Sequence, residues 1–278
     1  MKKYALCLGY LPKTNYSGFS SQLHDPKNIL TQVISAFKEA RLVDLEIDSE
    51  IRFASRTDRG VGALDQIVSL NAKHSPILPE INFYLSDSIR VLGLTKVSSS
   101  FHPRRDAILR TYTYYLTIND DFDIIIARKM LSMLVGRHDF RNFAKRDPKK
   151  EIGTIKDIKT AEIVPVADGT YQIRLSSKSF LWQQVRRIIG HLIEVSTGKY
   201  DLEYTQQLLE AKTTKLKPPT APAEYLVLET VQYNDVQFTY DQKALHSFQQ
   251  TLRGHLMDAK AKTALYEFIT GHLRGKMV

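Results

Sequence analysis

The stretch ASRTDRGVGALDQ, residues 54–66, places one carboxylate, Asp58, between two arginines, Arg56 and Arg59. A nearby cation favours the charged form of a carboxyl group, and an ionised carboxylate is what nucleophilic attack on an electrophilic carbon requires. The same composition, with Gly60 after the second arginine, is also common in ordinary charged turns. Taken alone, the stretch fits a structural turn better than a reactive site, and the rest of the chain has to decide between them.

Two further side chains, Tyr112 and Arg186, have the chemistry to act on a nucleotide together with Asp58. Tyr112 could stack on a base or transfer a proton, although a tyrosine in a strand is more often a core aromatic with its hydroxyl bonded at the edge. Arg186 could hold a carboxylate in its active rotamer through paired hydrogen bonds, although a solvated arginine is the ordinary outcome. The sequence does not show whether the three side chains lie together.

Basic residues cluster with aromatic ones in three segments, residues 102–105 (HPRR), 137–143 (RHDFRNF) and 144–150 (AKRDPKK). This mixture suits phosphate contacts with base stacking nearby. A solvated charged surface would explain each segment separately. The residues that we predict to contact RNA are Arg56, Arg59, His102, Arg104, Arg110 and Arg141.

The overall charge favours a polyanionic partner. Lys and Arg total 39 against 30 for Asp and Glu, which gives a net charge of +9 and a sequence pI near 9.4. A basic surface attracts nucleic acid first and anionic membrane second. A membrane partner is less favoured, because no apolar run is long enough to span a bilayer. The N-terminal residues also lack the apolar stretch and cleavage site of a signal peptide. We therefore expect a soluble, cytoplasmic protein.

Metals and nucleotide cofactors are not indicated. Cys7 is the only cysteine, so neither an intramolecular disulfide nor a thiolate cluster for zinc is expected. The eight histidines are scattered and the acidic residues form no recognisable cation loop. The segment from Gly60 to Gly62 lacks the third glycine of a dinucleotide fingerprint, and no Walker motif occurs. We expect no cofactor.

Hydrophobic periodicity predicts a mixed α and β chain in which the Asp58 loop lies between two strands. The length of 278 residues favours two domains, with one large domain as the alternative. We place the boundary before the strand near residue 110, which gives domains 1–104 and 105–278. The predicted strands are 4–10, 51–55, 65–72, 91–98, 110–116, 158–166, 171–176 and 225–233. The predicted helices are 25–41, 79–88, 124–135, 181–195 and 202–212, followed by a helical tail of about forty residues.

Six segments, in order, resemble the tRNA pseudouridine synthase A family. Arg56-Thr57-Asp58 and the following glycines resemble its catalytic motif, in which the Asp is the catalytic residue. The segment 101–114 resembles the second motif, with Tyr112 at the place of the tyrosine that lies against the target base. The segment 180–190 resembles the third, with Arg186 at the place of the arginine that pairs with the catalytic Asp. The remaining landmarks are 16–18, 138–143 and 221–231.

Four positions depart from the residues common in the family. Phe19 stands where Trp is common, Gly62 where His is, Asp65 where Gly is, and Trp182 where Tyr or His is usual. The tail after Tyr233 is also longer than the resemblance leads us to expect. These departures bear on target-site preference more than on reaction class.

The resemblance implies an α+β fold of two ferredoxin-like mixed α/β domains, whose sheets join around a central basic cleft. It implies a homodimer that acts on tRNA. It also implies the substrate, which is uridine in the anticodon stem-loop, typically at positions 38 to 40 of the tRNA.

The resemblance also implies roles for individual residues. Asp58 would attack the ribose C1′ carbon of the target uridine or assist elimination to a glycal, and both routes stay open. Arg186 would orient Asp58, and Tyr112 would stack on the uracil and help to remove the C5 proton. Arg56 would fill or brace the space that the uridine leaves when it is flipped out of the stack.

A non-catalytic tRNA or structured-RNA binder of the same fold is the alternative from another class, and it predicts the same salt-dependent binding. Retention of Asp58, Tyr112 and Arg186 together argues against it, because a pure binder does not need an anion that faces phosphates. A metal-dependent nuclease that uses Asp58 lacks partner carboxylates. The sequence therefore predicts an isomerase, a tRNA pseudouridine synthase.

Overall fold

The structure is a computed structural model that describes residues 1–12, 15–20, 25–43, 51–118, 121–145, 153–167, 169–210 and 217–274. The predicted helix end at residue 212 and the basic residues 146–150 lie outside these ranges. In chain order the elements are β1 (Lys2–Tyr10), α1 (Ile29–Glu39), β2 (Arg52–Phe53), β3 (Gly62–Ala72), α2 (Leu78–Phe83), β4 (Ile89–Lys96), β5 (Leu109–Thr117), α3 (Ile124–Met133), β6 (Gly136–Asp139), a 3₁₀ turn (Arg141–Phe143), β7 (Ile155–Ala167), β8 (Thr170–Ser177), α4 (Gln184–Ser196), α5 (Leu202–Leu209), β9 (Leu226–Gln232), β10 (Thr239–Tyr240) and α6 (Gln242–Arg274).

The strands form one mixed sheet in the order β10-β4-β1-β3-β9-β5-β8-β7-β6, with β2 paired to β3. Neighbouring strands are antiparallel except β3 and β9, which form a short parallel pair at Gly62 with Val227 and at Ala63 with Leu228. Leu228 also pairs with Tyr112 of β5. Tyr112 therefore lies two strands from the point where the chain leaves the Asp58 loop, which is a consequence of the register alone.

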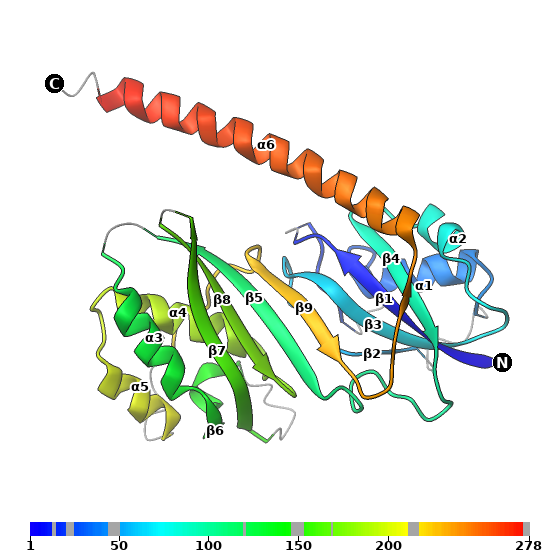
Figure 1. Cartoon of the computed structure of the whole chain (residues 1–278), viewed down its shortest axis with the longest axis horizontal. Coiled ribbons are helices and arrows are strands. Elements are labelled where there is room, and N and C mark those ends of the chain that lie inside the picture. The colour runs from blue at the N-terminus through cyan, green and yellow to red at the C-terminus, as the bar shows by residue number, and fades with distance from the viewer. Residues whose placement is uncertain are drawn as a thin grey trace.

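Apart from α6, the helices lie in two groups, one at each end of the sheet (Figure 1). Helices α1 and α2 lie at the end of the sheet that contains β1 and β4, whereas α3, α4 and α5 lie at the end that contains β5, β7 and β8. One hydrophobic cluster nevertheless runs through both groups and includes the fully buried Ile67, Leu228 and Ile189. A continuous core of this kind holds the two ends of the sheet in a fixed relation.

Local sequence explains where several helices begin. The backbone N–H groups of the first turn of a helix have no partner within the helix. In three helices, the side-chain oxygen of the preceding residue accepts a hydrogen bond from one of these groups. These residues are Asn28 before α1, Asp123 before α3 and Asp201 before α5. Helix α1 consequently starts later than the predicted residue 25.

The last part of the chain returns to the N-terminal end of the sheet. β10 pairs with β4, and Phe248 of α6 packs against Leu11 and Leu92. Beyond this contact α6 extends along the length of the molecule (Figure 1), with large apolar side chains such as Leu256 and Phe268 exposed. The predicted helical tail is present.

Two other differences from the predicted elements have local causes. The segment 138–143 lies outside the predicted helices and strands, but its first residues form the end of β6, which pairs with β7. Helix α4 begins at Gln184 rather than 181 because Gln183 adopts a left-handed conformation, with φ of 63°. The mixed α/β architecture is confirmed, while the division into two ferredoxin-like domains, 1–104 and 105–278, stays a prediction.

None of the helices that the structure describes combines the length and the apolar character needed to cross a bilayer. Within the same ranges, no group of three or more His, Cys, Asp or Glu side chains is arranged to hold a metal ion. Cys7 is buried in β1, and its thiol lies 3.2 Å from the Asp65 carboxylate.

His191 of α4 is a buried histidine that couples the stability of the fold to pH. Its Nε2 lies 2.9 Å from the hydroxyl oxygen of Thr205, and its Nδ1 has no hydrogen-bond partner in the described part of the chain. Burial lowers the pKa of His191 from its ordinary value of 6.5 to about 4. The unfolded chain therefore binds a proton at this residue more readily than the folded protein does between these two pH values.

We predict that the free energy of unfolding falls as the pH falls from about 6.5 towards 4, because protonation of His191 favours the unfolded state. At pH 4.5 this residue should account for a loss of about 2–3 kcal/mol. Urea unfolding of the wild type and of His191→Gln at pH 7 and pH 4.5 measures the difference. An equal loss in both proteins would contradict the assignment.

Candidate active site

Buried polar contacts fix the backbone just before Asp58. Gln66 of β3 is fully buried. Its side chain accepts a hydrogen bond from the Ser55 N–H group (3.1 Å) and donates one to the Ser55 carbonyl group (2.6 Å). The hydroxyl oxygens of Tyr10 and Thr57 are 2.9 Å apart. The loop is thus tied to both β1 and β3.

A second loop packs directly against the backbone of Asp58. Phe19 and Thr57 exchange backbone hydrogen bonds of 3.0 and 3.2 Å. Gly18 has a φ of +95°, and a Cβ atom there would lie 2.5 Å from the Thr57 carbonyl oxygen and 2.8 Å from the Asp58 carbonyl carbon. Glycine is required here both for the positive φ and for the close approach.

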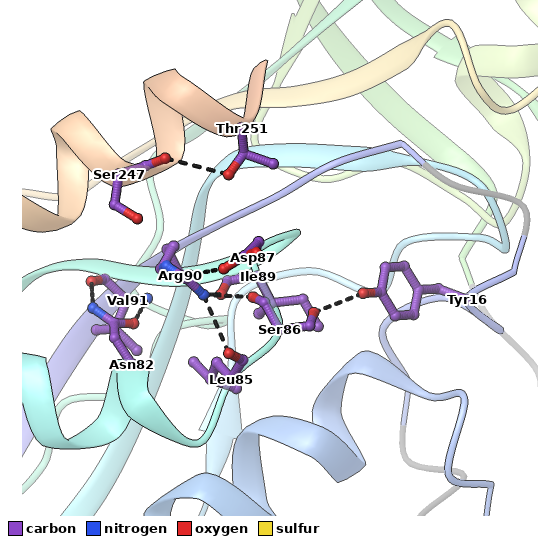
Figure 2. A network of polar contacts seen from close by, with 10 residues as sticks. All are labelled: Tyr16, Asn82, Leu85, Ser86, Asp87, Ile89, Arg90, Val91, Ser247 and Thr251. Atoms are coloured by element: carbon purple, nitrogen blue, oxygen red, sulfur yellow. Dashed lines mark hydrogen bonds and ion pairs between the residues drawn. The ribbon is translucent and has the colours of Figure 1, made fainter. Parts of the chain in front are cut away.

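The loop that carries Gly18 is anchored in turn to the start of β4. The hydroxyl oxygen of Tyr16 lies 2.9 Å from that of Ser86 (Figure 2). The turn that contains Ser86 is held by Arg90, a buried arginine that donates to the Ser86 carbonyl oxygen. Its other acceptors are the Leu85 and Ile89 carbonyl groups and the Asp87 carboxylate (Figure 2). Because these acceptors satisfy the buried Arg90 guanidinium, they hold the turn in place. Ser86 is therefore a fixed partner for the Tyr16 hydroxyl.

Arg110 of β5 ties the Asp58 loop to the other half of the sheet. It is 5% exposed, and its guanidinium donates to the Ser55 hydroxyl (3.0 Å) and to the Ala54 carbonyl (2.9 Å). It also donates to the Lys178 carbonyl group, just beyond β8. An RNA contact by Arg110 stays a prediction; in the free protein its guanidinium braces the loop.

The carboxylate of Asp58 meets two donors from the N-terminal end of α4. Arg186 Nη1 lies 3.0 Å from Asp58 Oδ2, across 128 positions of sequence. Trp182 Nε1 donates to Asp58 Oδ1 at 3.0 Å. The ion pair is largely enclosed, since the Arg186 and Asp58 side chains are 16% and 22% exposed. The structure therefore brings together two of the three predicted catalytic residues.

Arg186 is itself held by the segment that precedes β9. Its Nε donates to the Ala221 carbonyl oxygen (2.7 Å), and the Ala221 N–H group donates to the Arg186 carbonyl oxygen (3.1 Å). Gly190, one turn along α4, allows this approach, because a Cβ atom there would lie 2.1 Å from the Pro219 carbonyl oxygen. The guanidinium is thus directed at Asp58 by backbone contacts.

Tyr112 of β5 lies within electrostatic range of Asp58. Its ring is 8% exposed and meets Phe180 edge-on, with centroids 5.4 Å apart. Burial raises the pKa of the Tyr112 hydroxyl, and the negative charge of Asp58 raises it further, while a side-chain hydrogen bond with Ser55 lowers it. Tyr112 is therefore neutral at neutral pH, within range of the Asp58 charge.

The predicted RNA-binding side chains differ in exposure. Arg56, Arg59 and Arg104 are exposed, as a contact with phosphate requires. His102 is partly exposed, and partial burial together with nearby arginines lowers its pKa. Arg141 is already paired with the carboxylate of Asp139.

Sequence reasoning did not predict the contact of Trp182 with Asp58. The indole reaches the carboxylate because the left-handed turn at Gln183 separates it from α4. The sequence holds two signals of this contact. Trp182 lies four residues before Arg186, and it differs from the residues common in the family at that position.

Comparison with known proteins assigns the family. A family model described as tRNA pseudouridine synthase matches residues 130–234. The tRNA pseudouridine synthase A of Thermococcus kodakarensis is 34% identical over 267 residues, which are 95% of this chain and 97% of that protein. The tRNA pseudouridine synthase A of Methanobrevibacter smithii is 31% identical over 281 residues, with 96% of each chain covered.

The chain belongs to the tRNA pseudouridine synthase A family. This family is one of tRNA-modifying isomerases, so the prediction of an enzyme of this class is confirmed. Among solved structures, the archaeal box H/ACA sRNP Nop10-Cbf5 complex is similar with a TM-score of 0.35 and 9% identity, over 68% of this chain and 42% of that chain. A similarity this low supports no structural argument.

We predict that Gly18→Ala lowers the rate of pseudouridine formation at least about tenfold and destabilises the synthase by about 1–3 kcal/mol, because alanine must adopt a positive φ and would push against the backbone of Asp58. Pseudouridine mapping in tRNA and urea unfolding provide the measurements. Gly254→Ala in α6 is the control, since a Cβ there meets nothing within 4 Å. Wild-type rate and stability in Gly18→Ala would refute the prediction.

Proposed function

We propose that this synthase isomerises uridine to pseudouridine in the anticodon stem-loop of tRNA, with Asp58 as the catalytic nucleophile. The observation that carries the proposal is the 3.0 Å contact between Arg186 Nη1 and Asp58 Oδ2, which joins the segment that resembles the third family motif to the segment that resembles the first, in a partly enclosed site. The choice of the anticodon stem-loop rests on the family resemblance.

The reaction rearranges one nucleoside without net oxidation or hydrolysis. The bond from ribose C1′ to uracil N1 breaks, the base turns, and a bond from C1′ to C5 forms. The C5 proton leaves and N1 regains a proton, so atoms and electrons balance. The chemistry needs one oxygen nucleophile or base at C1′ and a group that steers the uracil.

Asp58 has the geometry for the first of these tasks. A carboxylate offers about four lone-pair sites, and the donors of Arg186 and Trp182 engage one site on each oxygen. At 22% exposure the side chain remains accessible. Its cationic partner is fixed in advance, which lowers the cost of orienting the nucleophile at the moment of reaction.

Tyr112 suits the second task. Because burial raises the pKa of its hydroxyl, it meets the substrate as a neutral phenol rather than a phenolate. We propose that it stacks on the uracil beside Asp58 and that its hydroxyl steers the C5 proton away. The aromatic face, rather than a negative charge, is its principal contribution.

The substrate uridine has to leave the helical stack, which costs a few kcal/mol. We propose that two ferredoxin-like halves, residues 1–104 and 105–278, flank a basic cleft at the β3–β9 junction, where phosphate contacts offset that cost. The exposed Arg56, Arg59 and Arg104 are suited to such contacts, and Arg56 would occupy the space of the flipped base. Homodimer formation rests on the family resemblance alone, and the cytoplasmic location rests on the sequence features described above; both stay predictions.

We predict that Asp58→Asn lowers the rate of pseudouridine formation by about 10³-fold or more, while the Kd for tRNA changes less than about threefold, since binding depends mainly on phosphate contacts. Mapping of pseudouridines by position, together with a filter-binding assay, measures both quantities. Asp258→Asn, which breaks only an ion pair with Lys262 on α6, is the matched control. A normal rate in Asp58→Asn would show that the nucleophile is another group.

Arg104→Ala should weaken tRNA binding to a similar extent for all substrates. The slope of log K against log salt concentration should become shallower by about 0.7–0.9, the value for one lost phosphate contact. Arg128→Ala, an exposed arginine on α3, should leave the slope unchanged. Identical slopes for Arg104→Ala and wild type would remove Arg104 from the RNA-binding surface.

A further inference from the structure

The Asp58 carboxylate is held at both oxygens, but only one of these contacts belongs to Arg186. The contact of Arg186 is through Nη1 and reaches Oδ2, while its Nε is engaged with the Ala221 carbonyl oxygen. A single hydrogen bond leaves a carboxylate able to pivot about the bonded oxygen, whereas two bonds at different oxygens fix its plane. The second bond, at Oδ1, comes from the indole N–H group of Trp182.

The backbone around Trp182 is built to present the indole. Gln183, the next residue, has a φ of 63° and a ψ of 7°, a left-handed conformation that is strained for a non-glycine residue. Gln184, which is fully buried, stabilises the turn, since its side chain accepts from the Leu181 N–H group (2.8 Å) and its own N–H group donates to the Leu181 carbonyl (3.1 Å). Strain of this kind persists where the surroundings determine the conformation.

Lys145 contacts Trp182 both at its backbone and over one face of the indole ring. Its backbone N–H group donates to the Trp182 carbonyl oxygen (2.9 Å), and its Nζ lies 4.4 Å from the ring centroid. A cation over an indole ring is attracted to it and makes the N–H group a stronger donor to an anion. The indole thus contacts the Lys145 ammonium through one ring face and the Asp58 carboxylate through its N–H edge, even though 48% of Trp182 is exposed.

We propose that Trp182 is a positioning residue for catalysis, whose indole N–H group fixes the plane of the Asp58 carboxylate so that an unengaged lone pair is directed at the ribose. This inference rests on the proposed role of Asp58 as nucleophile. Arg186 supplies the charge and one anchor point, and Trp182 supplies the second. The exposed part of the indole leaves room for the substrate to approach the same carboxylate.

Trp182→Phe tests the kinetic consequence, because phenylalanine keeps an aromatic ring under Lys145 and removes only the donor. We expect kcat to fall about 10- to 100-fold, as for the loss of a hydrogen bond to a charged group, with KM and the Kd for tRNA within about twofold. Tyr266→Phe, in the exposed part of α6, is the control and should keep wild-type kinetics. Wild-type kcat in Trp182→Phe would overturn the inference, and so would a loss that is confined to KM.

The contact itself can be observed without catalysis, because Trp182 is the only tryptophan in the chain. A ¹⁵N-labelled sample gives one indole N–H signal, which we expect to move upfield and to exchange faster with solvent in Asp58→Ala than in the wild type. An unchanged signal would overturn the inference. If Asp58→Asn is inactive while Trp182→Phe is fully active, only the inference about Trp182 fails; if Asp58→Asn is active, the proposed function fails.

Discussion

The ion pair between Asp58 and Arg186 is the contact on which the rest of the site depends. Its partners come from the loop before β3 and from α4, 128 positions apart, and the pair is mostly shielded from solvent. An enclosed charge that loses its partner is strongly destabilised, so both segments have to be placed accurately. The short β3–β9 pairing, the buried Gln66 and the close approaches at Gly18 and Gly190 all serve that placement.

Much of this arrangement could be predicted from the sequence. Apolar periodicity located α1, α3, α4 and the strands on both sides of the Asp58 loop to within a few residues, because a packed face leaves a regular pattern. The resemblance of the motifs to those of the tRNA pseudouridine synthase A family predicts Asp58 and Arg186 as partners, and their ion pair is present. The sheet register pairs Tyr112 of β5 with Leu228 of β9, which in turn pairs with Ala63 of β3, shortly after the Asp58 loop.

The remainder depends on long-range packing or on unusual backbone, which leave little trace in a single sequence. No local pattern shows that Gln183 takes a left-handed conformation, and so none shows that Trp182 reaches Asp58. Arg110 belongs to a basic, aromatic stretch typical of RNA contacts, yet it is buried. Carbonyl oxygens of distant segments accept hydrogen bonds from its guanidinium and so make this burial possible. The packing of α6 against β4 through Phe248 also leaves no local pattern, since it joins segments that are far apart in the sequence.

Chemical rescue of Arg186→Ala by guanidinium tests most directly whether the guanidinium group of α4 positions the Asp58 carboxylate for catalysis. The rate of pseudouridine formation in tRNA would be measured at increasing guanidinium concentration, below the concentration that unfolds the variant. The account predicts a rate that is low without guanidinium and rises to a plateau, with no rise in the wild type. A folded Arg186→Ala variant that already has the wild-type rate, or one that stays inactive at every guanidinium concentration, would contradict it.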